Sequence, residues 1–114
     1  MFNGIVKSIG SVVSVLSQEG GVLTTIRTSL KRHFKKGESV LVDGICSTVV
    51  SARSGTLTFF YMEETIQKTN VSSYALGTRV NIESSLRLGE DLSGHVISGH
   101  VDGVGTIHSI QEKG

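Results

Sequence analysis

The sequence predicts an all-β fold in a single domain, residues 1–114, whose strands close into a small barrel or pack as a sandwich. Short runs rich in Val, Ile and Thr alternate with turns that contain glycine, which is typical of small β domains. The chain holds 14 glycines and no proline, a composition that suits tight turns and bends in a strongly curved sheet. Few of the expected strands carry the charges that protect an open edge, so closure of the sheet is favoured.

About six strands are expected, and the turn residues between them mark where they end. Glycines at 20 and 21 separate the first two strands, while Asp43-Gly44 and Ser54-Gly55 are typical of hairpin turns. One short helix is expected over 63–70, because acidic residues precede Lys68 there, the charge order that a helix prefers. The β-prone segments are 5–16, 22–28, 40–42, 45–52, 56–62, 80–83 and a last one at 95–110.

Composition excludes several classes of protein. No apolar run approaches the roughly 20 residues of a membrane span. The first residues lack the basic and long apolar regions of a signal peptide, so no membrane partner is expected. Cys46 is the single cysteine, which excludes an internal disulfide and agrees with a reducing compartment. We therefore expect a cytoplasmic protein.

A local basic cluster occupies residues 31–36, although the net charge of the chain is only +1. A nucleic-acid groove needs exposed aromatic side chains among its charges, and only Phe34 is available there. The cluster therefore predicts a solvated loop, and no nucleic-acid partner is expected. A small barrel that binds nucleic acid remains the alternative.

The stretch SGHVISGHVDG contains two histidines five residues apart, His95 and His100. In a regular strand these positions point to opposite faces, so the two side chains could not bind one metal ion together. The glycine before each histidine suggests a bend, or a close approach of the backbone to a flat ligand. The alternative, which the spacing by itself favours, is a pair of ordinary histidines at a glycine-rich turn.

Cys46 lies in a predicted strand, where a lone cysteine is usually a small buried apolar side chain. In a functional interpretation it belongs to a polar wall, with Thr48 on the same face of the strand and Ser47 on the opposite face. A zinc site formed by Cys46, His95 and His100 is conceivable, but the usual spacings of zinc ligands are absent. No P-loop, nucleophile elbow or dinucleotide-binding fingerprint occurs, and no metal is expected.

Four motifs in order resemble the riboflavin synthase family, in particular its N-terminal lumazine-binding barrel. They are MFNGIV at 1–6, DGICSTV at 43–49, the pattern Met62, Glu64, Thr65 through Thr69-Asn70, and GHVISGHVDG at 94–103. The resemblance implies a six-stranded antiparallel Greek-key closed barrel with one or two short helices. It also implies that the chain is the N-terminal half of a two-barrel enzyme.

The resemblance further implies a dismutation without a cofactor, in which two molecules of 6,7-dimethyl-8-ribityllumazine exchange a four-carbon unit. The products are riboflavin and 5-amino-6-ribitylamino-uracil. In the family, each site lies between an N-terminal barrel and the C-terminal barrel of a neighbouring subunit in a homotrimer. The isolated domain is expected to form a homodimer that binds ligand with little or no turnover. A lumazine or flavin carrier without catalysis is the alternative.

Residues carried over from the resemblance fall into two groups. His100 is expected to transfer a proton, Cys46 and Thr48 to position or polarise the ring, and Phe2 to order the site. The other positions expected to affect activity are Ser39 and His95. The expected ligand wall comprises Gly4, Ile5, Val6, Cys46, Ser47, Thr48, Phe60, Tyr61, Met62, Glu63, Glu64, Thr65, Gly99, His100 and Val101. Two of these depart from the family pattern, because Ser47 replaces a leucine and Phe60 replaces a frequent aspartate.

Overall fold

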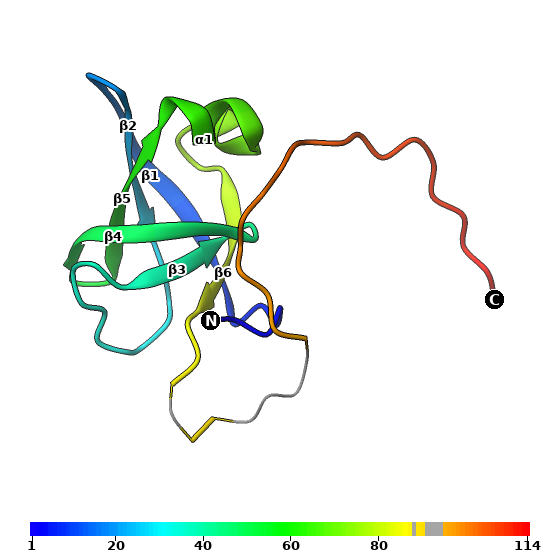
Figure 1. Ribbon diagram of the computed structural model, residues 1–114, viewed down its shortest axis with the longest axis horizontal. Coiled ribbons are helices and arrows are strands. Elements are labelled where there is room, and N and C mark those ends of the chain that lie inside the picture. Colours follow the sequence, from blue (N-terminus) through cyan, green and yellow to red (C-terminus); the bar gives the residue numbers. More distant parts are fainter. Residues whose placement is uncertain (88, 91–94) are drawn as a thin grey trace.

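Six antiparallel strands form a closed barrel in the computed structural model, which describes residues 1–87, 89–90 and 95–114 (Figure 1). Their order around the barrel is β1-β2-β5-β4-β3-β6, and the pairing of β1 with β6 closes it. This confirms the all-β prediction and selects the Greek-key barrel over the sandwich. The strands are β1 (Ser8–Gln18), β2 (Gly21–Arg27), β3 (Ser39–Val42), β4 (Ile45–Arg53), β5 (Thr56–Met62) and β6 (Arg79–Ser84).

Both predicted hairpin turns are present, and both use backbone conformations with positive φ. Asp43 and Gly44 adopt φ values of 50° and 78° between β3 and β4, and Ser54 and Gly55 adopt 34° and 82° between β4 and β5. Two consecutive positive φ angles are those of a type I′ turn, whose twist matches that of the flanking strands. Local turn chemistry therefore sets the register of β3, β4 and β5.

The barrel interior is filled by side chains that alternate along each strand. Ile26, Val42, Phe59 and Ile82 come from four different strands and are completely buried. Alternation means that each inward residue leaves its neighbour on the outer face, so one strand can serve the core and a surface site together. Burial of each such side chain contributes about 1.5–3 kcal/mol to stability.

One α-helix, α1 (Glu63–Lys68), is followed by a 3₁₀ turn, η1 (Asn70–Ser73), as the charge order predicts. Lys68 donates a hydrogen bond to Glu64 one turn earlier at 2.9 Å. This bond and the attraction between the two charges lower the pKa of Glu64 and raise the pKa of Lys68. Thr69 then accepts a hydrogen bond from the Val71 N–H at 3.2 Å, which starts the 3₁₀ turn.

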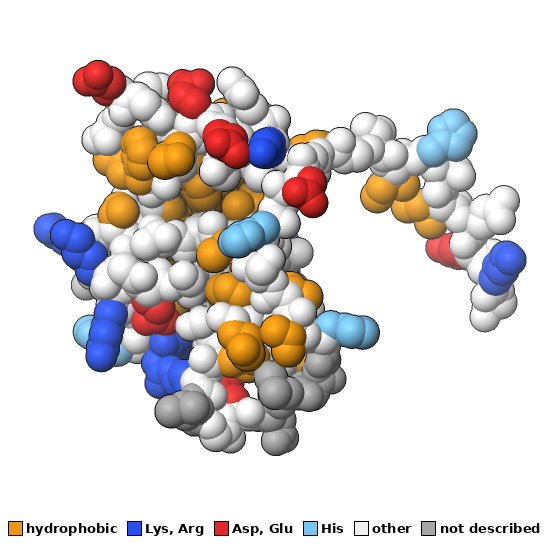
Figure 2. Space-filling view, viewed as in Figure 1, with side chains coloured by type: hydrophobic (Ala, Val, Ile, Leu, Met, Phe, Trp, Pro, Cys, Tyr) orange, Lys and Arg blue, Asp and Glu red, His pale blue; other side chains and the backbone are white. Residues whose placement is uncertain are grey.

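The last predicted β segment, 95–110, contains no strand in its described residues, and this prediction was wrong. Its one β-type contact is an isolated bridge between Ile97 and Phe2. A β-prone segment needs a free strand edge, and closure of the barrel between β1 and β6 leaves none. Residues 102–114, called the tail below, instead extend away from the barrel with exposed side chains (Figures 1 and 2). No helix among the described residues is long and apolar enough to cross a membrane.

Candidate functional site

The outer face of β3 and β4 carries a row of predicted site residues. Cys46 lies opposite Leu41, and two positions further along Thr48 lies opposite Ser39. Cys46 is partly exposed and Thr48 is exposed, whereas Ser47 between them is buried in the barrel interior. The alternation of the strand therefore presents a thiol and two hydroxyl groups on one surface.

A segment distant in the sequence, residues 97–101, crosses this surface and is called the strap. Two backbone hydrogen bonds hold it: the Cys46 N–H donates to the Gly99 carbonyl at 2.8 Å, and the Ile97 N–H donates to the Phe2 carbonyl at 2.9 Å. Gly99 has φ +82°, and a Cβ added to it would lie 2.3 Å from Leu41 Cδ2 and 3.0 Å from Cys46 Cβ. Only glycine allows the strap to approach β3 and β4 this closely.

A hollow of about 370 Å³, called the strap hollow, lies between the strap, β4 and α1. Charged side chains line it on two sides, with Glu64 and Lys68 on the helix and Asp102, the first residue of the tail, next to the strap. The negative charge of Asp102 contributes, after Glu64, to the raised pKa of Lys68. The hollow is lined by Ile45, Cys46, Glu64, Thr65, Lys68, Thr69, Gly99, His100, Val101 and Asp102.

The N-terminal segment is fastened to β6 by a buried carboxylate. One oxygen of Glu83 accepts hydrogen bonds from the N–H groups of Asn3 and Gly4, at 3.0 and 3.1 Å. Glu83 is 4% exposed, and Phe2 beside the bonded segment is 2% exposed. The buried carboxylate thus offsets its loss of water with two backbone donors. It also fixes Phe2, the residue that holds the strap.

A smaller hollow of about 110 Å³ lies beside Ile97 of the strap. Gly4, Val6 and Ile97 line it together with Leu41, which is also the cross-strand partner of Cys46. The structure therefore divides the predicted ligand wall into two parts, with the N-terminal part on one side of Leu41 and Cys46 on the other.

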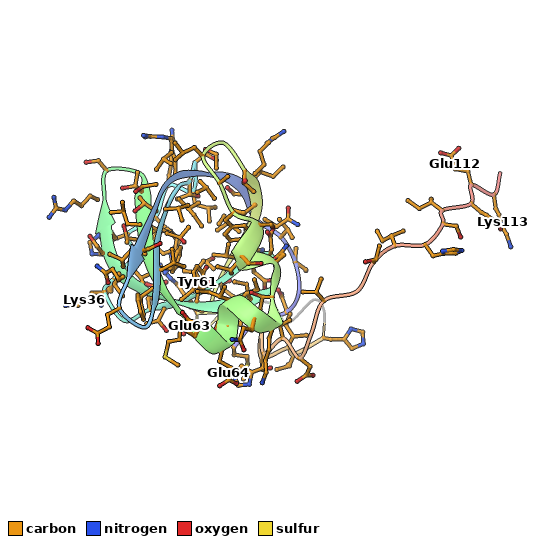
Figure 3. The ribbon with its side chains drawn as sticks, turned by 90° about the horizontal axis from the view of Figure 1, so that it is seen from above. Lys36, Tyr61, Glu63, Glu64, Glu112 and Lys113 are labelled. Carbon is orange, nitrogen blue, oxygen red and sulfur yellow. The ribbon has the colours of Figure 1, made fainter. Side chains whose placement is uncertain are left out.

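Ser47 and Tyr61 face the interior of the barrel and bind each other, as the inward position of Tyr61 in Figure 3 illustrates. Their hydroxyl oxygens are 2.7 Å apart, and Ser47 also donates to the Ile45 carbonyl at 3.0 Å. Burial raises the pKa of the Tyr61 phenol, and the bond to Ser47 only partly opposes this shift. Ser47, which departs from the family pattern, thus provides a hydrogen-bond partner for a buried tyrosine.

Six of the predicted wall residues meet in the strap hollow: Cys46, Glu64, Thr65, Gly99, His100 and Val101. The strap hollow and the smaller hollow do not include Ser39, Thr48, His95, Ile5, Phe60, Met62 and Glu63 among their lining residues. Sequence reasoning missed Lys68, Asp102 and Glu83. The Asp-Gly pair that ends the histidine motif was a signal for Asp102, and helical spacing from Glu64 was a signal for Lys68.

The two histidines of the motif have different positions. Both are exposed, but only His100 lines the strap hollow, and His95 lies outside it. Within residues 1–87, 89–90 and 95–114, no cluster of three or more metal-ligating side chains occurs. Ser93 and Gly94, which begin the first copy of the repeated Ser-Gly-His-Val motif, lie outside the described residues.

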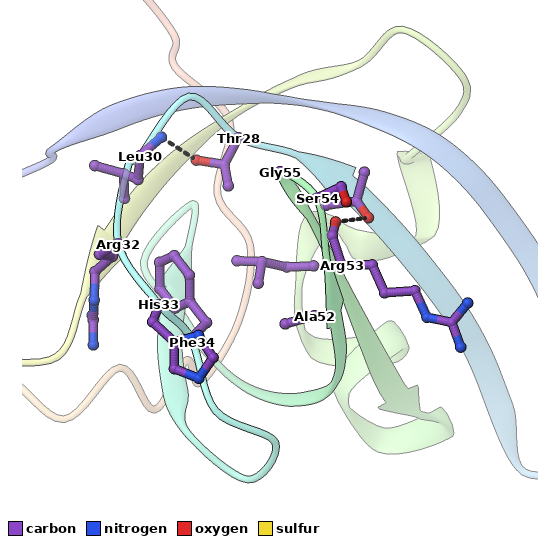
Figure 4. A pocket seen from close by; sticks show the side chains of 11 residues that line it. Thr28, Leu30, Arg32, His33, Phe34, Ala52, Arg53, Ser54 and Gly55 are labelled. Atoms are coloured by element: carbon purple, nitrogen blue, oxygen red, sulfur yellow. Dashed lines mark hydrogen bonds between the residues drawn. The ribbon is translucent and has the colours of Figure 1, made fainter.

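The basic cluster at 31–36 lies at a different hollow, shown in Figure 4. Arg32 there forms an ion pair with Glu38 at 2.6 Å, and its guanidinium lies 4.5 Å from the centre of the Phe34 ring. This hollow has a volume of about 130 Å³, roughly a third of that of the strap hollow. Size and lining both favour the strap hollow as the candidate site.

Comparisons with known proteins agree with this fold. Residues 3–85 match the family described as the lumazine binding domain. The chain is 37% identical to the riboflavin synthase of Chlamydia trachomatis and 33% identical to that of Bacillus subtilis, over 99% of its own length in each case. It covers 57% and 53% of these two relatives, so it spans about half of their length.

Among solved structures, the crystal structure of LumP complexed with 6,7-dimethyl-8-(1'-D-ribityl) lumazine matches 90% of this chain and 58% of that one. The TM-score is 0.75 and the sequence identity is 24%, so the likeness supports the fold. The family match covers most of the chain and includes all six strands of the barrel. This chain therefore belongs to the lumazine-binding domain family.

Proposed function

We propose that this chain binds 6,7-dimethyl-8-ribityllumazine or riboflavin in the strap hollow, as the N-terminal barrel of a riboflavin synthase. The observation that carries the proposal is the meeting of Cys46, His100 and Gly99 in one hollow, although the histidine motif and the cysteine motif are about 50 residues apart in the sequence. A hollow of about 370 Å³ falls within the usual range for small-molecule sites.

The polar groups of the hollow suit a ligand with a flat heterocycle and a polyhydroxylated chain. His100 and Thr65 can each donate or accept a hydrogen bond, and Lys68 and Asp102 provide one strong donor and one strong acceptor. The apolar side chains of Val101 and Ile45 can contact the ring. Hydroxyl groups of a ribityl chain can bind acidic and basic side chains alike, so the mixed charge of the hollow is compatible with such a chain.

The proposed reaction transfers a four-carbon unit between two lumazines and needs no resident cofactor. One lumazine loses a proton from its C7 methyl group, and the other must accept a nucleophile at its own C7. His100 is the proposed proton-transfer group, and Cys46, which lines the hollow, orients the ring, so positioning supplies much of the rate acceleration. A single strap hollow holds one of the two heterocycles, and the other has to be held by a second barrel.

The second barrel in the proposed enzyme is the C-terminal barrel of the same type of chain in a homotrimer. For this chain by itself, a second copy is the proposed partner, which gives a homodimer around a two-fold axis. Sedimentation velocity at several concentrations tests the assembly, and a species that remains monomeric at all of them would contradict it. A lumazine-consumption assay on the same samples is expected to show little or no turnover.

Ligand binding is tested by fluorescence titration with riboflavin and with 6,7-dimethyl-8-ribityllumazine. We expect His100→Ala to weaken binding modestly and, in the two-barrel protein, to lower turnover far more, since a proton-transfer group acts mainly in the transition state. His108→Ala is the matched control, because His108 is exposed on the tail. Equal effects of His100→Ala and His108→Ala would show that the ligand binds elsewhere. Unchanged binding in both His100→Ala and Cys46→Ser would show the same.

A further inference from the structure

Two arginines flank one serine on the outer wall of the barrel, and none of the three lines the strap hollow. Strand β1 pairs with β2 on one side and with β6 on the other (Figure 1). In these two registers Ser11 is the direct partner of both Arg27 and Arg79. Directly opposed residues of antiparallel strands project from the same face, so the three side chains form a row across three strands.

The row borders a surface hollow of about 350 Å³. The hollow lies where the pairing of β1 with β2 ends. Arg27 is the last residue of β2, and the next residue, Thr28, donates its N–H to the Gly55 carbonyl beside β5. Ser29 follows Thr28 and, with Ser11, adds a hydroxyl group to the lining of the hollow. The lining thus combines the two arginines with three hydroxyl-bearing residues, Ser11, Thr28 and Ser29, and includes no acidic side chain.

Both arginines are exposed, and neither forms an ion pair with another described residue. The ion pairs formed within the described part of the chain join Arg32 to Glu38 and Lys68 to Glu64, and involve neither Arg27 nor Arg79. Neighbouring strands lie about 4.8 Å apart, so the two arginine backbones are about 10 Å apart and both side chains can reach a group above Ser11. A negative ion there would relieve the repulsion between the two guanidinium groups.

We propose that this row, Arg27–Ser11–Arg79, is a binding site for a phosphate-type oxyanion, distinct from the strap hollow. A guanidinium presents parallel N–H donors that match two oxygens of a phosphate group, which two arginines could hold from opposite sides. The serine hydroxyls supply further donors to the remaining oxygens. Free phosphate and the phosphate group of a phosphomonoester share this chemistry, and the experiment below distinguishes them.

The test follows the amide spectrum of the ¹⁵N-labelled chain during titration with sodium phosphate, with glycerol phosphate, and with sodium chloride at matched ionic strength. Phosphate is expected to shift amides near residues 11, 27 and 79 in a saturable way, and chloride is not. Arg79→Gln and Arg27→Gln should each weaken phosphate binding about fivefold, as expected for an exposed ion pair. Arg79→Lys keeps the charge but loses the paired donors, so it should retain only part of the affinity.

Arg53→Gln is the matched control, since it removes one exposed arginine from the hairpin between β4 and β5. Its effect should stay below about twofold, because it removes only long-range attraction. Tighter binding of glycerol phosphate than of phosphate would identify a phosphomonoester as the ligand, and the reverse would identify free phosphate. Equal losses in Arg53→Gln and Arg79→Gln, or equal shifts with chloride, would overturn the discrete site. An oligonucleotide would overturn the discrete site as well, if it bound more tightly than phosphate and if removing Lys36 weakened its binding as much as removing Arg27 or Arg79.

Discussion

The strap and the tail are consecutive extended segments of similar composition, yet they differ in how the backbone is held. The strap, residues 97–101, is held by backbone hydrogen bonds to Phe2 and Cys46 and carries His100 into a hollow. The tail, residues 102–114, has apolar side chains at regular intervals. Its first three residues still line hollows beside the barrel, and the rest stands clear of it, as Figure 2 shows. β-propensity therefore does not by itself order a segment. Order comes from a backbone hydrogen-bond partner, and the tail has none among the residues that the structure describes.

The two segments also differ in what their glycines do. Gly99 lies against Leu41 and Cys46, with no room for a side chain, whereas Gly103 and Gly105 have no atom within 4 Å of an added Cβ. Glycine in the strap is a requirement of close packing, and glycine in the tail is not. Matched substitutions in the two segments should therefore have different effects, with losses of stability or ligand affinity for the strap and little change for the tail.

The largest effect is expected from Phe2, whose backbone holds the strap. Phe2→Ala removes a completely buried ring and should lower the free energy of unfolding by about 3 kcal/mol. Ile107→Ala in the tail removes a side chain that is 77% exposed and should change it by less than about 0.5 kcal/mol. Urea unfolding of both variants measures the difference, and similar values for the two would show that the tail is packed in solution.

Gly99→Ala should weaken lumazine or riboflavin binding about tenfold or more. An alanine at φ +82° is strained, and its Cβ would overlap Leu41, so the strap must lift away from β4. Gly103→Ala is the matched control and should leave affinity unchanged. Fluorescence titration of both variants measures the effect. Unchanged affinity in Gly99→Ala would mean that the strap does not form part of the ligand site.

Glu83→Gln should have an intermediate effect on stability, a loss of about 1 kcal/mol. The amide oxygen can still accept from Asn3 and Gly4, but it is a weaker acceptor than the carboxylate. Thermal unfolding is the measurement, with Glu112→Gln in the tail as the control that should have no effect. A gain in stability for Glu83→Gln would show that desolvation of the carboxylate outweighs its two hydrogen bonds.

The smallest effect at neutral pH concerns the two tyrosines, neither of which lies in the strap or the tail. Burial raises the pKa of both Tyr61 and Tyr74 above the ordinary 10.0, and for Tyr74 the hydrogen bond to Asp43 adds to the shift. Their contribution to stability is therefore complete below pH 10.0 and is lost progressively as the pH rises above it. Absorbance of tyrosinate against pH should show ionisation only together with unfolding. A titration near pH 10.0 in the folded state would show that a phenol is accessible to water.

Much of the barrel could be predicted from the sequence, because its determinants are local. The Asp43-Gly44 and Ser54-Gly55 turns, the helix near Lys68 and the opposite faces of Ser47 and Thr48 all depend on residues a few positions apart. The mistaken strand at 95–110 followed from the same local reasoning. Its β-propensity was visible in the sequence, whereas the closure that removes its partner edge depends on all six strands.

The sequence by itself thus determined the all-β fold class, the hairpin turns and, through the motif resemblance, the family of this protein. Only the tertiary structure decided which side chains meet. Glu83 binds the N–H of Asn3 across 80 positions of sequence, Ser47 binds Tyr61 inside the barrel, and Arg27 and Arg79 share Ser11 as a partner. Spacing along a chain predicts a contact only within one strand, turn or helix. Contacts between distant segments depend on the register and closure of the whole sheet, which no single segment encodes.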